Sequence, residues 1–218
     1  MTGLLLKYCG NKSLEDLLVT TNSNAHYIGF IFAGSKRQVC VDELSEWLSQ
    51  VDIKDKKLVG VFVNATAEEI ATIVSKVPLS IIQCHGNESV DVILDIKTKV
   101  NLPVWKAIHH QENALKIMQS LSGIVDGYIV DSRVKGVWGG TGISFDWNAV
   151  PNYLEEAKRQ GVLCFIAGGV SSKNVDGLLK HCPQGIDLSS GIELNNVKDK
   201  QLVDQLEERV GIYESSTR

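Results

Sequence analysis

The sequence predicts a single-domain α/β protein folded as a (β/α)8 barrel. Three observations favour this fold class: short apolar segments alternate with helical patterns, eight such segments are present, and 218 residues suit a compact eight-stranded barrel. A doubly wound open sheet is the alternative arrangement of the same alternating elements. No low-complexity linker divides the chain, so we expect one domain over residues 1–218 with a loose, Ser- and Thr-rich tail at 213–218.

The expected strands are nearly continuously apolar instead of alternating between apolar and polar residues. This pattern is typical of parallel strands that helices cover on the outside of the sheet. The eight expected strands are residues 4–9, 27–32, 58–63, 80–84, 104–108, 127–131, 163–167 and 186–188.

An amphipathic helical pattern follows each expected strand. Ser13, Thr66 and Ser89 stand at positions where a side-chain oxygen would cap the first turn of a helix. The expected helices are residues 14–21, 41–51, 68–76, 90–100, 114–121, 148–160, 174–181 and 198–210.

Composition favours a small-molecule partner over nucleic acid. The net charge is −4, the pI is about 5.7, and no basic block occurs in the chain. No apolar run approaches the ~18 residues that span a bilayer, and the first residues carry no signal pattern, so we expect no membrane partner and a cytoplasmic location. Five scattered cysteines without CxxC spacing predict neither a disulfide framework nor a zinc site.

Chemically active residues follow several expected strands, where a barrel of this class carries its active site. Cys9 ends the first strand, Arg37 lies in the loop after the second, His85 follows the fourth, and Asp131 ends the sixth. A glycine-rich loop at 135–142 follows Asp131. The simpler alternatives are a buried apolar cysteine and a turn-capping aspartate.

The loops after the seventh and eighth strands predict a phosphate site. They contain Gly168-Gly169 and Ser190-Gly191. Glycines let bare backbone N–H groups approach an anion, and barrels often bind phosphate between these two loops. Tight turns are the alternative explanation of the same glycines.

Seven segments, in order along most of the chain, resemble phosphoribosylanthranilate isomerases of tryptophan biosynthesis. They are residues 6–10, 29–37, 60–64, 83–86, 131–142, 167–170 and 185–193. The resemblance implies a (β/α)8 barrel without a cofactor or metal. It also implies an Amadori rearrangement of N-(5-phosphoribosyl)anthranilate to 1-(2-carboxyphenylamino)-1-deoxyribulose 5-phosphate, with a sugar phosphate as ligand.

The same resemblance implies roles for individual residues. Asp131 matches the general acid and Cys9 the general base, Arg37 the partner of the anthranilate carboxylate, Asp187 a group near the substrate amine, and His85 a histidine near the site. The alternative interpretation of Arg37 is a solvated arginine on the surface. The alternative interpretation of Asp187 is a buried carboxylate that accepts hydrogen bonds from loop N–H groups.

Some residues depart from the family pattern or suggest other functions. Asn11 and Lys12 stand where the family carries an apolar residue and then Thr or Arg, and Cys84 replaces a frequent Leu; Lys12 offers a cation that would favour a Cys9 thiolate. The pair His109-His110 suggests metal binding together with His85. Adjacent strand residues point to opposite faces, which argues against that metal site.

Two alternative functions remain open on the sequence. The related isomerase of histidine biosynthesis uses an aspartate at the end of strand one, where this chain has Cys9. A non-catalytic barrel would keep the phosphate loops and be expected to lose the acid or the base, and this chain carries both. No long apolar stripe demands a partner, so we expect a monomer.

Overall fold

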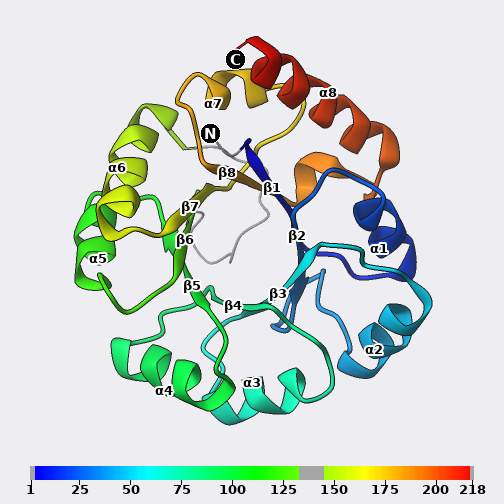
Figure 1. The fold of residues 1–218 in the computed structure, drawn as a ribbon, viewed down its shortest axis with the longest axis vertical. Helices are drawn as coiled ribbons and strands as arrows, with labels where there is room; N and C mark the ends of the chain where they lie inside the picture. The colour runs from blue at the N-terminus through cyan, green and yellow to red at the C-terminus, as the bar shows by residue number, and fades with distance from the viewer. Residues whose placement is uncertain (1–2, 133–144, 217–218) are drawn as a thin grey trace.

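A computed structural model describes residues 3–132 and 145–216. Eight parallel strands form a closed barrel in which each strand pairs with the next and β8 pairs with β1 (Figure 1). Helices surround the barrel on its outside (Figure 1). The predicted (β/α)8 fold is therefore confirmed, and closure of the sheet excludes the open doubly wound alternative.

The eight strands differ from the predicted segments by at most one residue at either end. They are almost entirely buried because helices cover one face and the barrel interior covers the other. The strands are β1 Leu5–Tyr8, β2 Tyr27–Ile31, β3 Lys57–Phe62, β4 Ile81–Cys84, β5 Val104–His109, β6 Gly127–Asp131, β7 Leu163–Ile166 and β8 Gly185–Leu188.

The helices follow the predicted order, and the three expected caps are present. Ser13, Thr66 and Ser89 each accept a hydrogen bond from a backbone N–H in the first helical turn, and Thr66 completes a capping box with Glu69. The helices are α1 Leu14–Thr21, α2 Val41–Gln50, α3 Ala67–Val74, α4 Val90–Val100, α5 Ala114–Ser120, α6 Val150–Gln160, α7 Val175–Leu179 and α8 Lys200–Ser216, with a short 3-10 helix at Trp147–Ala149 before α6.

The prediction of a loose tail from residue 213 is wrong as far as the described residues extend. Helix α8 continues to Ser216. The Glu214 carboxylate accepts a hydrogen bond of 2.7 Å from the backbone N–H of Leu4, just before β1. This contact ties the end of the helix to the start of the barrel, which Ser and Thr content alone does not reveal.

A short hairpin after β8 was not predicted. It consists of β9 Glu193–Leu194 and β10 Val197–Lys198, and it follows a 3-10 turn at Ser190–Ile192. Asn195 and Asn196 make the turn with φ of 53° and 63°, a conformation that asparagine tolerates. Because β10 takes Val197 and Lys198, helix α8 begins after residue 198, where the helix was expected to start.

The strands carry two separate apolar layers. Outward-facing residues pack under the helices, while inward-facing residues from the strands form a second cluster inside the barrel. Within that inner cluster the rings of Tyr27, Trp105 and Phe165 lie 5.0–5.4 Å apart, centroid to centroid. The inner cluster is Tyr27, Val59, Ile81, Trp105, Ala107, Ile129, Phe165 and Ala167.

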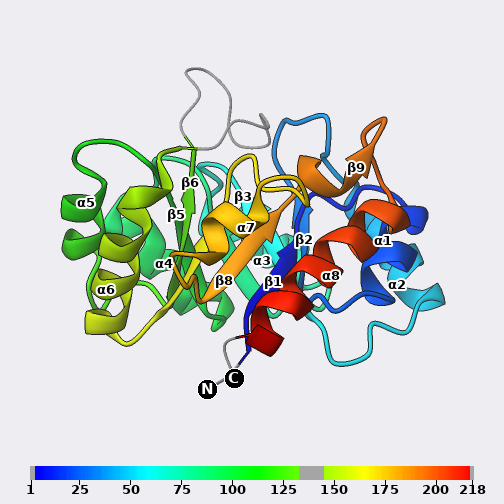
Figure 2. The same ribbon diagram turned by 90° about the horizontal axis from the view of Figure 1, so that it is seen from above.

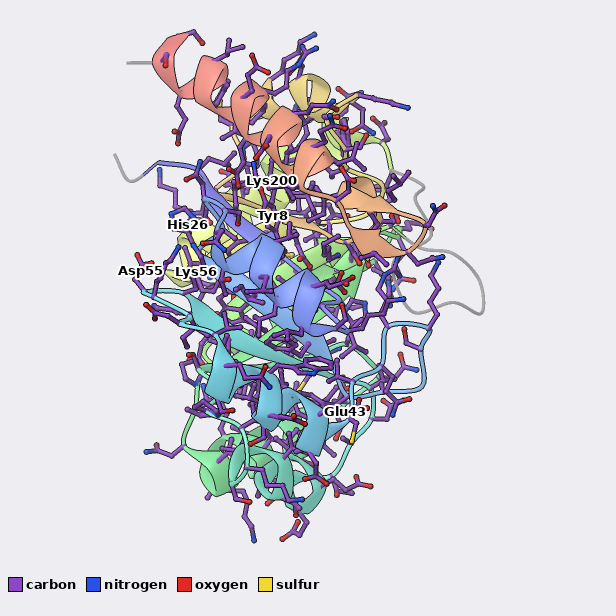
Figure 3. The ribbon with its side chains drawn as sticks, turned by 90° about the vertical axis from the view of Figure 1, so that its right-hand side faces the viewer. Tyr8, His26, Glu43, Asp55, Lys56 and Lys200 are labelled. Atoms are coloured by element: carbon purple, nitrogen blue, oxygen red, sulfur yellow. The ribbon has the colours of Figure 1, made fainter. Side chains whose placement is uncertain are left out.

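The two ends of the barrel differ in what surrounds them. The hairpin containing β9 stands at one rim, whereas the start of β1 and the end of α8 lie at the opposite end (Figure 2). At that opposite end, just before β2 and β3, His26 lies near Lys56 and Asp55 (Figure 3). Burial and the Lys56 charge lower the pKa of His26. Within the described residues, no helix combines the length and apolarity needed to cross a membrane.

Candidate active site

A cavity of about 700 Å³ opens among the loops that follow the carboxyl ends of the strands. This volume suits one small organic ligand. Eight of the nine residues predicted for the site line it: Cys9, Arg37, His85, Asp131, Gly168, Gly169, Asp187 and Ser190. Gly191 does not line it.

Cys9 follows β1 and is 7% exposed. Its backbone N–H donates a 2.8 Å hydrogen bond to the Leu188 carbonyl, which fixes the residue against β8. Burial raises the pKa of the thiol, while the positive charges of Lys7 and Lys198 lower it. Burial outweighs the two cations, so the pKa of Cys9 is raised overall, and Lys7 and Lys198 oppose this effect.

Asp187 lies across the β1–β8 pair from Lys7, with which it is in register. Its carboxylate Oδ1 accepts a hydrogen bond of 2.9 Å from Lys7 Nζ, and both side chains are buried. Burial raises the pKa of Asp187, and Lys7 counteracts this effect. The described partner of this carboxylate is therefore an ammonium group and not the loop N–H groups considered as the alternative.

Asp131 ends β6 and is 4% exposed. Its Oδ1 accepts a 2.7 Å hydrogen bond from the backbone N–H of Ser132, so one oxygen serves in a local turn. The other oxygen, Oδ2, lies 3.6 Å from His85 Nε2. Asp131 thus accepts the local turn hydrogen bond that was the alternative explanation of this residue, and it also lines the cavity.

Gln83 is a site residue for which the sequence suggested no role. Its amide Nε2 lies 2.9 Å from His85 Nδ1, and both residues are buried. With the amide as donor, Nδ1 accepts and neutral His85 carries its proton on Nε2, the nitrogen that faces Asp131. Gln83 lies in β4 and His85 follows its last residue, and this alternate spacing was the available indication that both point inward.

Arg37 is held by a carboxylate that the sequence analysis left without a role. Its Nε and Nη2 donate to Glu193 Oε1 and Oε2 at 2.8 and 2.7 Å, a bidentate pair. Arg37 is only 4% exposed, so the alternative of a solvated surface arginine is wrong. Glu193 also accepts a 2.8 Å hydrogen bond from Lys198 Nζ.

Lys198 joins this ion pair to the end of β1. Its fully buried ammonium donates to the carbonyl oxygens of Cys9 and Ser189 at 2.7 and 3.1 Å. The hairpin that carries Glu193 and Lys198 therefore fixes Arg37 relative to Cys9. Only one edge of the guanidinium is used by Glu193, and the edge containing Nη1 is left for a second planar anion.

Gly168 and Gly169 form the loop after β7 with φ of 86° and 66°. Their N–H groups have no hydrogen-bond partner among the described residues. A Cβ on Gly168 would lie 2.5 Å from Ser132 Oγ, so the backbone approaches β6 closely. Both glycines line the cavity, and their binding of an anion stays a prediction.

Gly191 serves a different purpose from the other three predicted phosphate residues. A Cβ at this position would lie 1.8 Å from the carbonyl oxygen of Val170. The absence of a side chain thus lets the loop after β8 pack on the loop after β7. The close spacing of the loops after β7 and β8 depends on this contact.

The loop after β1 contains Asn11 and Lys12, the two residues that depart from the family pattern. Asn11 is fully buried and donates to the carbonyls of Tyr8 and Gly29, while its Oδ1 accepts from Thr20 on α1. Lys12 does not line the cavity, and the expectation that it supplies a cation near Cys9 is wrong. Side-chain direction explains the difference, because Lys7 shares the inward face of β1 with Cys9.

The two adjacent histidines after β5 point in different directions, as strand alternation predicted. The His109 ring lies 5.6 Å from that of His85, whereas His110 Nδ1 lies 2.8 Å from the Tyr153 hydroxyl and its ring stacks on Phe145. Over residues 3–132 and 145–216, no group of three His, Cys, Asp or Glu side chains is arranged to hold a metal ion. The glycine-rich loop at 135–142 lies outside the described residues.

Comparison with known proteins shows which family the chain resembles. Residues 6–209 match the family model of N-(5'phosphoribosyl)anthranilate (PRA) isomerase. The chain is 52% identical over 213 residues to the N-(5'-phosphoribosyl)anthranilate isomerase of Geobacillus thermodenitrificans, covering 98% of this chain and 96% of that relative. The crystal structure of phosphoribosyl anthranilate isomerase from Thermotoga maritima has a TM-score of 0.82 and 25% identity, covering 95% of this chain and 98% of that one.

A further solved structure carries a ligand. It is a phosphoribosyl anthranilate isomerase in complex with reduced 1-(o-carboxyphenylamino)-1-deoxyribulose 5-phosphate, with a TM-score of 0.79, 24% identity, and coverage of 95% of this chain and 98% of that one. At this identity the likeness concerns the fold. The family match and the 52% identical relative show that this chain belongs to the N-(5'-phosphoribosyl)anthranilate isomerase family.

Proposed function

We propose that this chain catalyses the Amadori rearrangement of N-(5-phosphoribosyl)anthranilate to 1-(2-carboxyphenylamino)-1-deoxyribulose 5-phosphate. The observation that carries the proposal is that one cavity brings together Cys9 and Asp131, at the ends of β1 and β6, with Arg37 on its wall. Family membership supports the same reaction. The reaction needs one acid and one base on a ligand that carries two anionic groups, and the cavity offers a candidate for each need.

The two anions of the substrate anchor it across the cavity. Its carboxylate binds the free edge of Arg37, which Glu193 orients from behind. Its phosphate binds the backbone N–H groups of Gly168, Gly169 and Ser190. The ribose then lies between these anchors, within reach of the acid and the base.

Asp131 opens the sugar ring. Its protonated carboxyl donates a proton to the ribose ring oxygen, the bond from that oxygen to the anomeric carbon breaks, and a Schiff base to the anthranilate nitrogen forms. Asp131 is buried, and its Oδ2 lies 3.6 Å from His85 Nε2, whose N–H faces the carboxylate left after the proton has moved to the ring oxygen. Asp187 lies near the amine and favours its positively charged form.

Cys9 completes the rearrangement. As a thiolate it removes the proton from the carbon next to the Schiff base, the electron pair moves to the nitrogen, and an enolamine results. The enolamine tautomerises to the ketone, so the net change is a movement of hydrogen within the substrate. No external oxidant or reductant is consumed.

Turnover by the purified protein tests the proposal. N-(5-phosphoribosyl)anthranilate is supplied, and its conversion is followed spectroscopically, with the product identified by mass spectrometry. Conversion above the uncatalysed rate is expected. A folded protein that binds the reduced product analogue but gives no conversion would overturn the proposal and favour the non-catalytic binding module.

We also infer that the protein acts as a monomer in the cytoplasm. The exposed large apolar residues of the described chain are spread over several elements and form no single face: Leu18, Val92, Leu94, Leu194 and Ile212. A cytoplasmic location suits a doubly anionic substrate that does not cross membranes unaided. Sedimentation equilibrium tests the oligomeric state, and a stable dimer would contradict the inference.

A further inference from the structure

Lys7 is a charged residue without contact to solvent that lies next to the proposed base. Its side chain is 0% exposed. Lys7 lies in β1 and Cys9 follows its last residue, so the two are alternate residues and both point into the barrel. Asp187 is in register with Lys7 on β8, and its Oδ1 lies 2.9 Å from Lys7 Nζ.

The Lys7 ammonium interacts with two acidic groups at once. It donates a hydrogen bond of 2.9 Å to the Asp187 carboxylate, and its charge attracts an ionised Cys9, which lies two residues along the chain. A buried cation in this position stabilises the ionised form of each neighbour, because the low dielectric strengthens their attraction. The three side chains thus form one charged group at the junction of β1 and β8.

Other charged groups face the same region from the neighbouring elements. They are Lys198 on β10, Asp131 on β6, His85 on β4 and Arg37 in the loop after β2. Lys198 is engaged by Glu193 and by two carbonyl oxygens, and Arg37 is engaged by Glu193. Among the cations near Cys9, Lys7 has the largest lowering effect on the pKa of the thiol, and its described hydrogen-bond partner is the Asp187 carboxylate.

We propose that Lys7 is a positioning residue that holds Cys9 as a thiolate, and that Asp187 limits this effect by sharing the same cation. The inference rests on the proposed role of Cys9 as the base. The thiolate sulfur takes the proton from the substrate carbon and becomes a thiol. Lys7 remains protonated throughout and makes no bond to the substrate.

Removing Lys7 and removing Asp187 have opposite consequences for the thiol. Burial raises the pKa of Cys9, the charge of Lys7 lowers it, and the charge of Asp187 raises it. In Lys7→Met the thiolate loses its cation. In Asp187→Asn the cation loses its carboxylate and pairs with the thiolate instead.

The pH dependence of Cys9 alkylation by iodoacetamide measures this directly in the ligand-free, full-length protein. Mass spectrometry of the peptide containing Cys9 separates it from the other four free cysteines. In Lys7→Met we expect the alkylation rate at neutral pH to fall by about tenfold or more and its midpoint to move to higher pH. In Asp187→Asn the midpoint moves to lower pH.

Lys106→Met is the matched control. Lys106 is another buried lysine, but it pairs with Glu88 and the carbonyls near the end of β4. Its loss should leave the Cys9 midpoint unchanged. Circular dichroism checks each variant for folding. If Lys7→Met does not fold, the direction in which Asp187→Asn moves the alkylation midpoint of Cys9 still tests the proposal.

Unchanged midpoints, or shifts of the same sign in both variants, would overturn the proposal. A second readout is the pH profile of kcat: in Lys7→Met activity recovers as pH rises, whereas a merely structural defect lowers it at every pH. Because alkylation needs no turnover, shifted midpoints in a protein without isomerase activity would refute only the proposed function. An active enzyme with unshifted midpoints would refute only the role of Lys7.

Discussion

The inner face of the barrel has two regions that differ in chemistry although the same strands build both. Near the start of the strands the inward residues are apolar, whereas β1, β6 and β8 carry charged inward residues towards their ends. On β1 Leu5 precedes Lys7, on β6 Ile129 precedes Asp131, and on β8 Gly185 precedes Asp187. The alternation along each strand thus places an apolar layer near the amino ends of the strands, which we call the lower layer. It places a charged layer near their carboxyl ends, which we call the upper layer.

The two layers contribute to different properties: the apolar layer stabilises the fold, and the charged layer carries the residues proposed for catalysis. The apolar layer buries aromatic rings against one another, and such burial is the main favourable contribution to folding. The charged layer contains the pairs Lys7–Asp187 and Arg37–Glu193, for which desolvation offsets much of the attraction. Substitutions in the lower layer should therefore change stability, and substitutions in the upper layer should change catalysis.

The largest expected effect is on turnover, in the upper layer. Cys9→Ser should lower kcat by a factor of about 10²–10⁴, and Asp131→Asn by a similar factor, because each removes a positioned proton-transfer group. Steady-state kinetics measures kcat, and binding of the reduced product analogue serves as the control for an intact site. Near-normal kcat in either variant would assign that step to another residue.

The next effect is on stability, in the lower layer. Phe165 is fully buried and packs against Tyr27 and Trp105, so Phe165→Ala should lower the free energy of unfolding by about 3–5 kcal/mol. Urea denaturation measures it, with the half-exposed Leu18→Ala as a control that changes little. If Phe165→Ala kept full stability and lost kcat instead, the division between the two layers would be wrong.

A smaller effect is expected on substrate binding, and it tests whether the edge of the Arg37 guanidinium that Glu193 does not use binds the substrate carboxylate. Lysine at this position keeps the charge and one contact to Glu193 but has no second planar edge, so Arg37→Lys should weaken carboxylate binding nearly as much as Arg37→Ala. The expected loss is about 1.5–3 kcal/mol. Calorimetry compares the reduced product analogue with a version lacking the carboxylate, and equal losses for both ligands would refute the contact.

The smallest effect concerns the phosphate loop. Gly169 has a φ of 66°, so valine strains the loop and hinders approach to its N–H group. We expect Gly169→Val to raise KM for the phosphorylated substrate on the order of tenfold, the loss of about one hydrogen bond to a charged group. Ser190→Ala should change KM less, because the backbone does the binding. An unchanged KM in Gly169→Val would leave these glycines as turn residues only.

The sequence by itself predicted the (β/α)8 fold, with an open doubly wound sheet as its alternative, and eight of its nine predicted site residues line one cavity. Continuous apolar strands separated by capped helices specify a parallel barrel, and a barrel gathers its strand ends on one rim. Cys9, Asp131 and the glycine loops were therefore predictable from their position after a strand. Lys7 and Gln83 each stand two residues before a predicted site residue, Cys9 and His85. Strand alternation therefore also predicts that their side chains point inward.

Only the tertiary structure decided which of these side chains touch. Lys7 meets Asp187 because closure of the barrel pairs β1 with β8, 180 residues apart in sequence. Arg37 meets Glu193 because a hairpin after β8 turns back to the loop after β2. The end of α8 is fixed by the hydrogen bond from Leu4 to Glu214. Local pattern fixes which face a residue occupies, whereas its partner depends on the register of distant strands, which no local pattern encodes.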